Sequence, residues 1–432
     1  MSDNLKGIVV GVRLDDINKS VDEEKFNSEM NELIKLAEAC NIEILETVTQ
    51  SLPDFNNKTY VGKGKVDEIK QISEALEVDV VIFNDELTPV QISNLDQLLE
   101  KTIYDRTYLI LEIFKSRART KEAIIQVEMA SLSYMLPRLA GLRKGLSRQR
   151  GTGGGFAHGR GAGETKLELD RRITNDRIAA LKHELKELAK KRKQQRIKRN
   201  SSTIKTVCLV GYTNSGKSSL MNNLLKNSMT YQKEKEVLQK DMLFATLETS
   251  TRRINSIDGS FILTDTVGFI EKLPHMLIEA FKSTLEEIHD ADLLVHVVDS
   301  SNPKFLDQIN ATNNVLKELN VENIPVIYAF NKIDKVDSYL YIPNDFPEAI
   351  KISVKENINI NFLVKTIMEK LYVDYQKVTF IIPYTEQSLI YKLKEFVINV
   401  TIDYLDDCIE LKCKAPDKLI NQYLKYKKES KI

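Results

Sequence analysis

The sequence has few cysteines, few histidines, no long apolar run and no net charge. Four cysteines among 432 residues are too few and too scattered for a disulfide framework, which indicates a reducing compartment. With only five histidines, Cys408 and Cys413 are better explained as strand residues than as half of a metal site. No apolar run approaches the roughly 18 residues of a membrane helix, and the start, MSDNLKG, lacks a signal-peptide pattern. We therefore expect a cytoplasmic protein that makes no membrane contact.

The 62 basic and 62 acidic residues give no net charge, so the total charge indicates no partner. The residue patterns along the chain, in contrast, predict four domains or segments. Residues 1–108 alternate short apolar runs with amphipathic stretches, which predicts a small α/β domain. Residues 109–200 predict an antiparallel helical arm, whose first helix runs from about Leu109 to Leu136. Residues 201–374 have the strand–loop–helix pattern of an α/β nucleotide-binding domain, and 375–432 predict a small α+β domain. We expect an α/β protein and a monomer.

The two helices of the arm flank a glycine-rich loop at 141–163. Nine of the 17 glycines of the chain fall in this loop, together with five basic residues and no acidic one. Concentrated positive charge in a neutral chain indicates a polyanionic partner such as RNA, whereas a plain linker would not need it. The residues expected to contact RNA are Arg143, Lys144, Arg148, Arg150 and Arg160.

A phosphate-binding loop follows the arm, in the stretch KTVCLVGYTNSGKSSLMNNLL. It fits G-x-x-x-x-G-K-[ST] between a buried strand and a helix, so backbone N–H groups and the helix N-terminus would face phosphates. Lys217 would reach the β- and γ-phosphates, and the Ser218 hydroxyl would bind Mg²⁺. The strand–loop–helix setting makes a chance match improbable.

Three further elements follow in the order that a P-loop GTPase domain needs. In DTVGF, Asp265 would hold Mg²⁺ through a water, and the Gly268 N–H would meet the γ-phosphate. In NKID, the Asp334 carboxylate would accept both donors of guanine, which adenine lacks in that place. SVKEN offers Ser353 and backbone amides to the guanine carbonyl. The residues expected to contact GTP on these elements and the phosphate loop are Gly211, Tyr212, Thr213, Asn214, Ser215, Gly216, Lys217, Ser218, Asp265, Thr266, Val267, Gly268, Asn331, Lys332, Ile333, Asp334, Ser353, Val354 and Lys355.

These motifs and several longer stretches resemble the HflX family of GTPases, a branch of the translation-factor class related to Obg. The resemblance covers nearly the whole chain and includes YVGKGKVDEI, GRGAGETKLELDRR, LFATLETSTR and DTVGFI. It implies that Thr246 contacts Mg²⁺ and the γ-phosphate, and that Lys217, Thr246 and Gly268 serve catalysis. The neighbours of Thr246 implied to contact GTP are Phe244, Ala245, Leu247 and Glu248. Family members often read FATLDPTTR, where this chain has FATLETSTR.

The resemblance also implies a partner, the large ribosomal subunit, with the tip of the arm reaching ribosomal RNA. It implies a role in splitting or rescuing stalled ribosomes under stress. Two alternatives stay open: a GTP-controlled assembly factor for the large subunit, and an RNA-modifying enzyme that would use Cys413.

Phe269 stands where many GTPases have a Gln that orients the attacking water, so we expect slow intrinsic hydrolysis that the ribosome stimulates. Asn214 stands where related potassium-stimulated GTPases hold a monovalent cation. It either binds K⁺ or only stabilises a turn.

Overall fold

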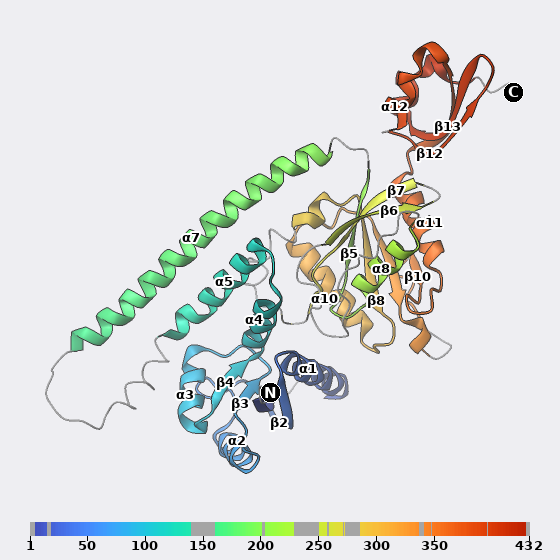
Figure 1. The fold of residues 1–432 in the computed structure, drawn as a ribbon. Coiled ribbons are helices and arrows are strands. Elements are labelled where there is room, and N and C mark those ends of the chain that lie inside the picture. Colours follow the sequence, from blue (N-terminus) through green and yellow to red (C-terminus); the bar gives the residue numbers. More distant parts are fainter. Residues whose placement is uncertain are drawn as a thin grey trace. The chain divides into compact units, whose positions relative to one another are not determined.

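The computed structural model describes residues 5–14, 19–139, 160–200, 204–228, 250–256, 259–270, 272, 286–336, 341–346, 348–394 and 396–428. Contacts divide the chain into two units, which are described separately (Figure 1). The N-terminal unit comprises Met1–Leu188, Met242–Phe244 and Lys272–Phe281. The second unit comprises Ala189–Asp241, Ala245–Glu271 and Lys282–Ile432.

The N-terminal unit contains a parallel sheet with the strand order β2-β1-β3-β4. The central strand β1 is buried from Gly7 to Val12, as expected for a parallel strand covered on both faces. Ile8, Val10 and Val12 pack with α2 and α3, whereas Gly11 lies against Phe26 and Met30 of α1. The elements are β1 (Leu5–Leu14), α1 (Lys19–Ala39), β2 (Ile42–Leu52), α2 (Lys63–Ala75), β3 (Val80–Phe83), α3 (Pro89–Leu99) and β4 (Thr102–Asp105).

The helical stretch after β4 is two helices, so the prediction of one continuous helix from Leu109 to Leu136 was wrong. The first, α4 (Arg106–Arg117), ends where Ala118 turns extended, with φ −63° and ψ 121°. The second, α5 (Lys121–Met135), begins where the Thr120 side chain accepts a hydrogen bond from the Ala123 N–H. A threonine that caps one helix cannot also continue the helix before it, because its own backbone is extended.

The antiparallel arm predicted from the sequence is confirmed in its described part. Helix α5 pairs with the long helix α7 (Arg160–Asn200), and η1 (Leu136–Arg138) follows α5. The ion pairs Lys121–Glu184 (2.5 Å) and Arg177–Glu128 (2.7 Å) run in opposite chain directions on the two helices, as in an antiparallel pair. Leu181 is buried. Of the loop predicted at 141–163, residues 141–159 lie outside the described residues, whereas residues 160–163 belong to the first turn of α7 and not to a loop.

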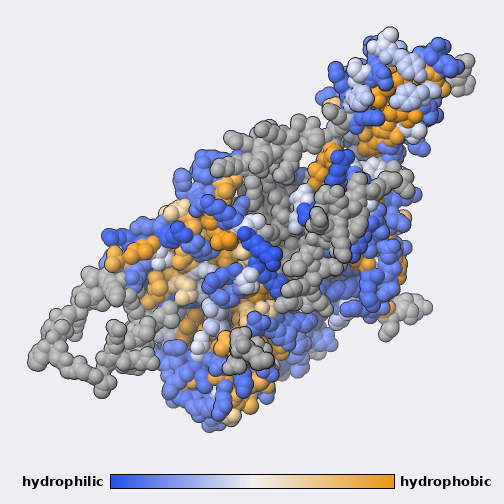
Figure 2. Space-filling view, viewed as in Figure 1, coloured by the Kyte–Doolittle hydropathy of each residue, from blue (hydrophilic) through white to orange (hydrophobic). Residues whose placement is uncertain are grey.

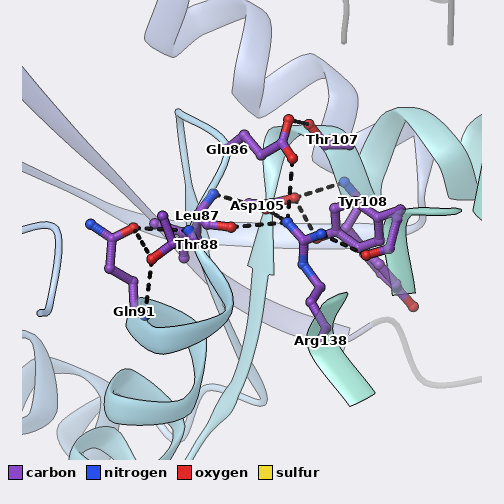
Figure 3. Close-up of polar contacts among 9 residues, drawn as sticks. Glu86, Leu87, Thr88, Gln91, Asp105, Thr107, Tyr108 and Arg138 are labelled. Carbon is purple, nitrogen blue, oxygen red and sulfur yellow. Dashed lines mark hydrogen bonds and ion pairs between the residues drawn. The ribbon is translucent and has the colours of Figure 1, made fainter. Parts of the chain in front are cut away.

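A buried polar cluster ties the base of the arm to the sheet (Figure 3). Asp105, at the end of β4, is fully buried and accepts hydrogen bonds from the N–H groups of Leu87 (3.1 Å) and Tyr108 (2.8 Å) and from the Tyr134 hydroxyl (2.8 Å). Arg138 pairs with Asp105 at 3.5 Å and donates to the carbonyls of Tyr134 (2.6 Å) and Leu87 (2.9 Å). Burial raises the pKa of Asp105, although its donors oppose the shift.

Replacing Arg138 by Ala is expected to lower the free energy of unfolding by about 3 kcal/mol, because it leaves a buried carboxylate without its cation. Urea denaturation of the whole chain measures this loss. Lys115→Ala is the control, since Lys115 pairs with Glu112 on the surface and such pairs contribute little. Equal losses in the two variants would contradict the anchoring role.

The second unit contains a six-stranded sheet with the order β10-β9-β8-β5-β7-β6. All neighbouring strands are parallel except β6 and β7, which are antiparallel. Because the parallel strands end at one edge, the loops after them meet there. The elements are β5 (Thr206–Val210), α8 (Lys217–Lys226), β6 (Ser250–Ser256), β7 (Gly259–Asp265), η3 (Glu286–Asp290), β8 (Leu293–Asp299), α10 (Phe305–Glu318), β9 (Val326–Asn331), η4 (Ile333–Lys335), β10 (Ala349–Lys351) and α11 (Ile360–Leu371).

The C-terminal part has an antiparallel sheet of order β11-β13-β12 whose core packs against α12 and α13. The face of this part seen in Figure 2 has an orange, hydrophobic patch among polar residues. The exposed aliphatic side chains of this part include Val400, Leu405 and Leu424. The P-loop domain, the N-terminal α/β fold, the arm and this small α+β domain together confirm the predicted fold class. The elements are β11 (Tyr375–Pro383), η5 (Tyr384–Glu386), α12 (Ser388–Lys394), β12 (Ile398–Tyr404), β13 (Cys408–Pro416), α13 (Asp417–Gln422) and η6 (Leu424–Tyr426).

Candidate nucleotide site

The phosphate loop joins the buried strand β5 to helix α8, and two of its glycines have backbone angles that other residues rarely adopt. Gly211 has φ 141° and Gly216 has φ 101°. An added Cβ would lie 2.3 Å from the Val297 carbonyl oxygen at Gly211, and 2.3 Å from the Asn331 Nδ2 at Gly216. The loop can therefore follow this path only with glycine at both positions.

Lys217 opens α8 and turns its side chain back over the loop. Its Nζ donates to the carbonyl oxygens of Gly211 (3.0 Å) and Tyr212 (2.7 Å). Burial lowers the pKa of Lys217 to about 8, while the Asp265 carboxylate opposes this shift. The ammonium is thus held where negative charge would stabilise it, as a phosphate-binding lysine requires.

The loop after β7 lies directly against the phosphate loop. The Ser218 hydroxyl donates to Asp265 at 2.6 Å, which joins the first residues of α8 to the end of β7. The Phe269 N–H donates to the Gly211 carbonyl (3.1 Å), and the Thr213 N–H donates to the Phe269 carbonyl (2.7 Å). The Phe269 side chain is buried, with 2% exposed, and Thr266 donates from its hydroxyl to the Leu209 carbonyl.

The segments expected to read the base converge on the same edge of the sheet. Asn331, at the end of β9, donates to the Ser215 carbonyl (2.9 Å) and accepts from the Val354 N–H (3.1 Å). The Ser353 hydroxyl donates to Asp334 at 2.6 Å and so lowers the pKa of that carboxyl. The Asp334 carboxylate is therefore oriented by Ser353, which is what recognition of two N–H donors needs.

Sequence reasoning missed Asp299, at the end of β8. Its carboxylate accepts a hydrogen bond from Lys332 Nζ at 2.7 Å, and the same ammonium donates to the Asn214 carbonyl at 2.8 Å. Lys332 therefore links β8 and the phosphate loop to the NKID segment. An Asp at the end of the otherwise apolar strand LLVHVVD was the available signal.

The structure brings together the described residues expected at the site, on the loops after β5, β7, β9 and β10. Lys355, next to Val354, pairs with Glu356 at 3.4 Å. Two predicted sets lie outside the described residues. The first is the segment around the switch threonine, Phe244, Ala245, Thr246, Leu247 and Glu248, and the second is the predicted RNA contacts Arg143, Lys144, Arg148, Arg150 and the side chain of Arg160. No group of three or more His, Cys, Asp or Glu side chains within the described ranges is placed to hold a metal. No described helix is both long and apolar enough to cross a membrane.

Three family models match the chain in succession. One described as GTP-binding GTPase N-terminal matches residues 27–115, and one described as GTP-binding GTPase middle region matches 117–199. A third, described as 50S ribosome-binding GTPase, matches 206–332. A crystallised GTP-binding protein of Sulfolobus solfataricus, in complex with GDP, aligns with a TM-score of 0.42 and 25% identity over 85% of this chain and 98% of that one.

Whole-chain relatives identify the family. The GTPase HflX of Caldanaerobacter subterraneus subsp. tengcongensis is 41% identical over 424 residues, which cover 97% of this chain and 94% of the relative. The GTPase HflX of Lacrimispora saccharolytica is 38% identical over 405 residues, which cover 92% of each. Identity of this level over nearly full length, together with a P-loop domain of the expected geometry, confirms the resemblance drawn from the motifs. The chain belongs to the GTPase HflX family and hydrolyses GTP.

Proposed function

We propose that this GTPase binds the large ribosomal subunit in a GTP-dependent way and acts in splitting or rescuing ribosomes under stress. The observation that carries the proposal is one chain that joins a GTPase domain to an antiparallel helical arm. Residues 141–163 of that arm contain five basic residues and no acidic one. The match of 206–332 to a model described as 50S ribosome-binding GTPase supports the same partner.

We assign the nucleotide chemistry to residues 201–374 and the RNA contact to the arm at 109–200, and we assign no chemistry to 1–108 or 375–432. Lys217 would hold the β- and γ-phosphates, the Gly268 N–H would face the γ-phosphate, and Asp334 with Ser353 would read guanine. The buried ammonium of Lys217 and the fixed carboxylate of Asp334 support these roles. Phe269 offers no proton acceptor, so the attacking water would be oriented by backbone groups or by the ribosome.

Mg²⁺ fits the proposed site, because the Ser218 hydroxyl and an Asp265 oxygen lie 2.6 Å apart. Oxygen ligands in small number, completed by phosphates, are the usual protein set for this ion. Ser218 would ligate it directly, Asp265 through a water, and Thr246 in the active state. When bound, the ion neutralises charge on the phosphates.

Two roles remain for Asn214. Its φ of 59° is a left-handed turn that Asn tolerates well, which supports a purely local role. A K⁺ ion held by Asn214 would add positive charge between the β- and γ-phosphates, where it would favour hydrolysis.

The RNA-modifying alternative is disfavoured by the environment of Cys413. The side chain is 5% exposed within β13, and burial raises the pKa of the thiol to about 12. A buried, protonated thiol is a poor nucleophile. The assembly-factor alternative needs the same GTP-dependent contact with the large subunit, but such a factor would monitor maturation of the subunit without splitting ribosomes.

Replacing Arg143, Lys144, Arg148 and Arg150 by Ser is expected to leave GTP binding unchanged and to weaken association with large subunits at least tenfold. With fewer contacts to phosphates, binding releases fewer counterions from the RNA. The affinity for large subunits should therefore depend less steeply on salt concentration. Pelleting of the protein with large subunits and a non-hydrolysable GTP analogue, at several salt concentrations, measures both effects.

The matched control replaces four exposed lysines of the C-terminal part, Lys377, Lys392, Lys394 and Lys418, and so removes the same charge. If this control weakened association with large subunits equally, the loss of affinity would follow from net charge alone. That result would contradict a specific role of the loop. Sedimentation of intact ribosomes with the wild type separates the two functions, because a splitting factor yields free subunits and an assembly factor does not.

A further inference from the structure

The Asp299 carboxylate, at the end of β8, uses both of its oxygens as acceptors. Oδ2 accepts a hydrogen bond of 2.7 Å from Lys332 Nζ, while Oδ1 accepts from the N–H (3.0 Å) and the hydroxyl (2.6 Å) of Ser301. The side chains of Asp299 and Lys332 keep only 18% and 19% of their surface exposed. Because Ser301 orients the carboxylate, the acceptor for the ammonium is fixed in direction as well as in place.

The Lys332 ammonium connects this carboxylate to the phosphate loop. Its Nζ also donates to the Asn214 carbonyl at 2.8 Å. Lys332 and Asn214 both have left-handed backbones, with φ 65° and 59°, and lysine rarely adopts that conformation. The ammonium thus holds a turn of the NKID segment against a turn of the phosphate loop.

Lys332 also begins the turn that carries Asp334. This turn, η4, follows Lys332 directly, and the Lys335 N–H donates to the Lys332 carbonyl at 3.0 Å. On the side of β10, the Ser353 hydroxyl holds the Asp334 carboxylate. A shift of Lys332 would therefore move Asp334 relative to the phosphate loop.

We propose that Asp299 is a positioning residue for guanine recognition. By holding the Lys332 ammonium against the Asn214 carbonyl, it sets the position of the Asp334 carboxylate relative to the phosphate loop. A guanine nucleotide is held at its base and at its phosphates, so its affinity depends on this pre-organised spacing. Asp299 acts through Lys332 and touches no nucleotide. The proposal rests on the site residues assigned under Proposed function and requires no ribosome.

The negative charge of Asp299 gives the effect of its removal an informative sign. A carboxylate close to the phosphate loop repels an anionic nucleotide, so its neutralisation would by itself favour binding. A loss of affinity on neutralising Asp299 is therefore not a direct effect of charge. It follows from the lost hold on Lys332.

Asp299→Asn is expected to weaken GDP binding roughly tenfold, as for one lost hydrogen bond to a charged group, and inosine diphosphate binding about threefold. Inosine lacks the exocyclic amine of guanine, so it loses less when Asp334 is displaced. The preference for GDP over inosine diphosphate should therefore fall about threefold. Isothermal titration of the whole chain with each nucleotide measures both affinities.

Asp292→Asn is the matched control, because Asp292 precedes β8 and makes the same kind of contacts at the other end of the strand. Its carboxylate accepts from Lys205 Nζ at 2.7 Å and from the Thr206 N–H at 2.9 Å. This variant loses the same charge and should bind both nucleotides as the wild type does. Adding Asp299→Asn to Lys332→Met should lower GDP affinity no further, because residues that act through one another are not additive.

Three results would overturn the proposal. These are unchanged affinities in Asp299→Asn, equal weakening of the two nucleotides, and additive losses when Asp299→Asn is combined with Lys332→Met. Equal weakening would show general damage to the site, and additive losses would show that Asp299 acts independently of Lys332. A wild type that does not bind GDP, or does not prefer it to inosine diphosphate, would instead refute the site assignment on which the proposal rests.

Discussion

Replacing Asp334 by Asn is expected to lower the affinity for GTP at least tenfold and to raise the affinity for xanthosine triphosphate. The carboxylate accepts two N–H donors of guanine, whereas the amide presents a donor of its own to them. Xanthine has a carbonyl in place of the exocyclic amine and so accepts from that amide. Ser353 donates to the Asp334 oxygen at 2.6 Å, and Asn keeps an acceptor there, so the exchange alters the chemistry of the site more than its shape.

Competition titrations with GTP and xanthosine triphosphate measure the change in specificity. Asp307→Asn, on the exposed face of α10, removes one charge from the same unit and should leave both affinities as in the wild type. If the Asp334 variant bound GTP as tightly as the wild type, Asp334 would not be the residue that reads the base.

Replacing Gly211 by Ala is expected to weaken nucleotide binding roughly 100-fold or more, because backbone strain and overpacking each cost a few kcal/mol. The residue has φ 141°, and the new Cβ would meet the Val297 carbonyl oxygen at 2.3 Å. A backbone oxygen within a central strand cannot move aside, so the loop itself must shift. Its N–H groups would then no longer converge on the phosphates.

Isothermal titration with GDP tests this loss, and circular dichroism shows whether the variant is folded. Gly64→Ala is the control, since nothing lies within 4 Å of the Cβ that it would add on α2. Gly64→Ala should bind GDP normally and be no less stable than the wild type. Normal binding by Gly211→Ala would show that the loop adapts and that glycine is not needed there.

The sequence alone predicted the nucleotide site, and the structure brings the described segments of that prediction to one edge of the sheet. The phosphate loop is one short segment between a strand and a helix, and its conformation depends on local backbone geometry. Its motif residues are Gly211, Gly216, Lys217 and Ser218. NKID and SVK could be located from the sequence because NKID begins at the last residue of the apolar strand β9 and SVK follows shortly after β10. The antiparallel arm was equally accessible, since its two apolar stripes repeat at helical spacing.

The break between α4 and α5 was a local signal that the prediction of one helix overlooked, since Thr120 caps the second helix. Other features depended on the tertiary structure. Asp299 gained its role only when the parallel sheet placed the end of β8 beside Lys332, 33 residues further along the chain.

The ion pairs of Lys272 show the same limit over a longer distance. Lys272 pairs with Glu29, which lies 243 positions earlier in the chain, and with Asp85, which lies 187 positions earlier. The partner of a charged side chain cannot be read from any periodic pattern in the sequence. The partner is decided by where the packed elements place the side chain, because these ion pairs form between residues that are distant in the chain. The sequence thus indicated which nucleotide chemistry the chain performs, and the packing of the folded chain decided which distant residues pair with one another.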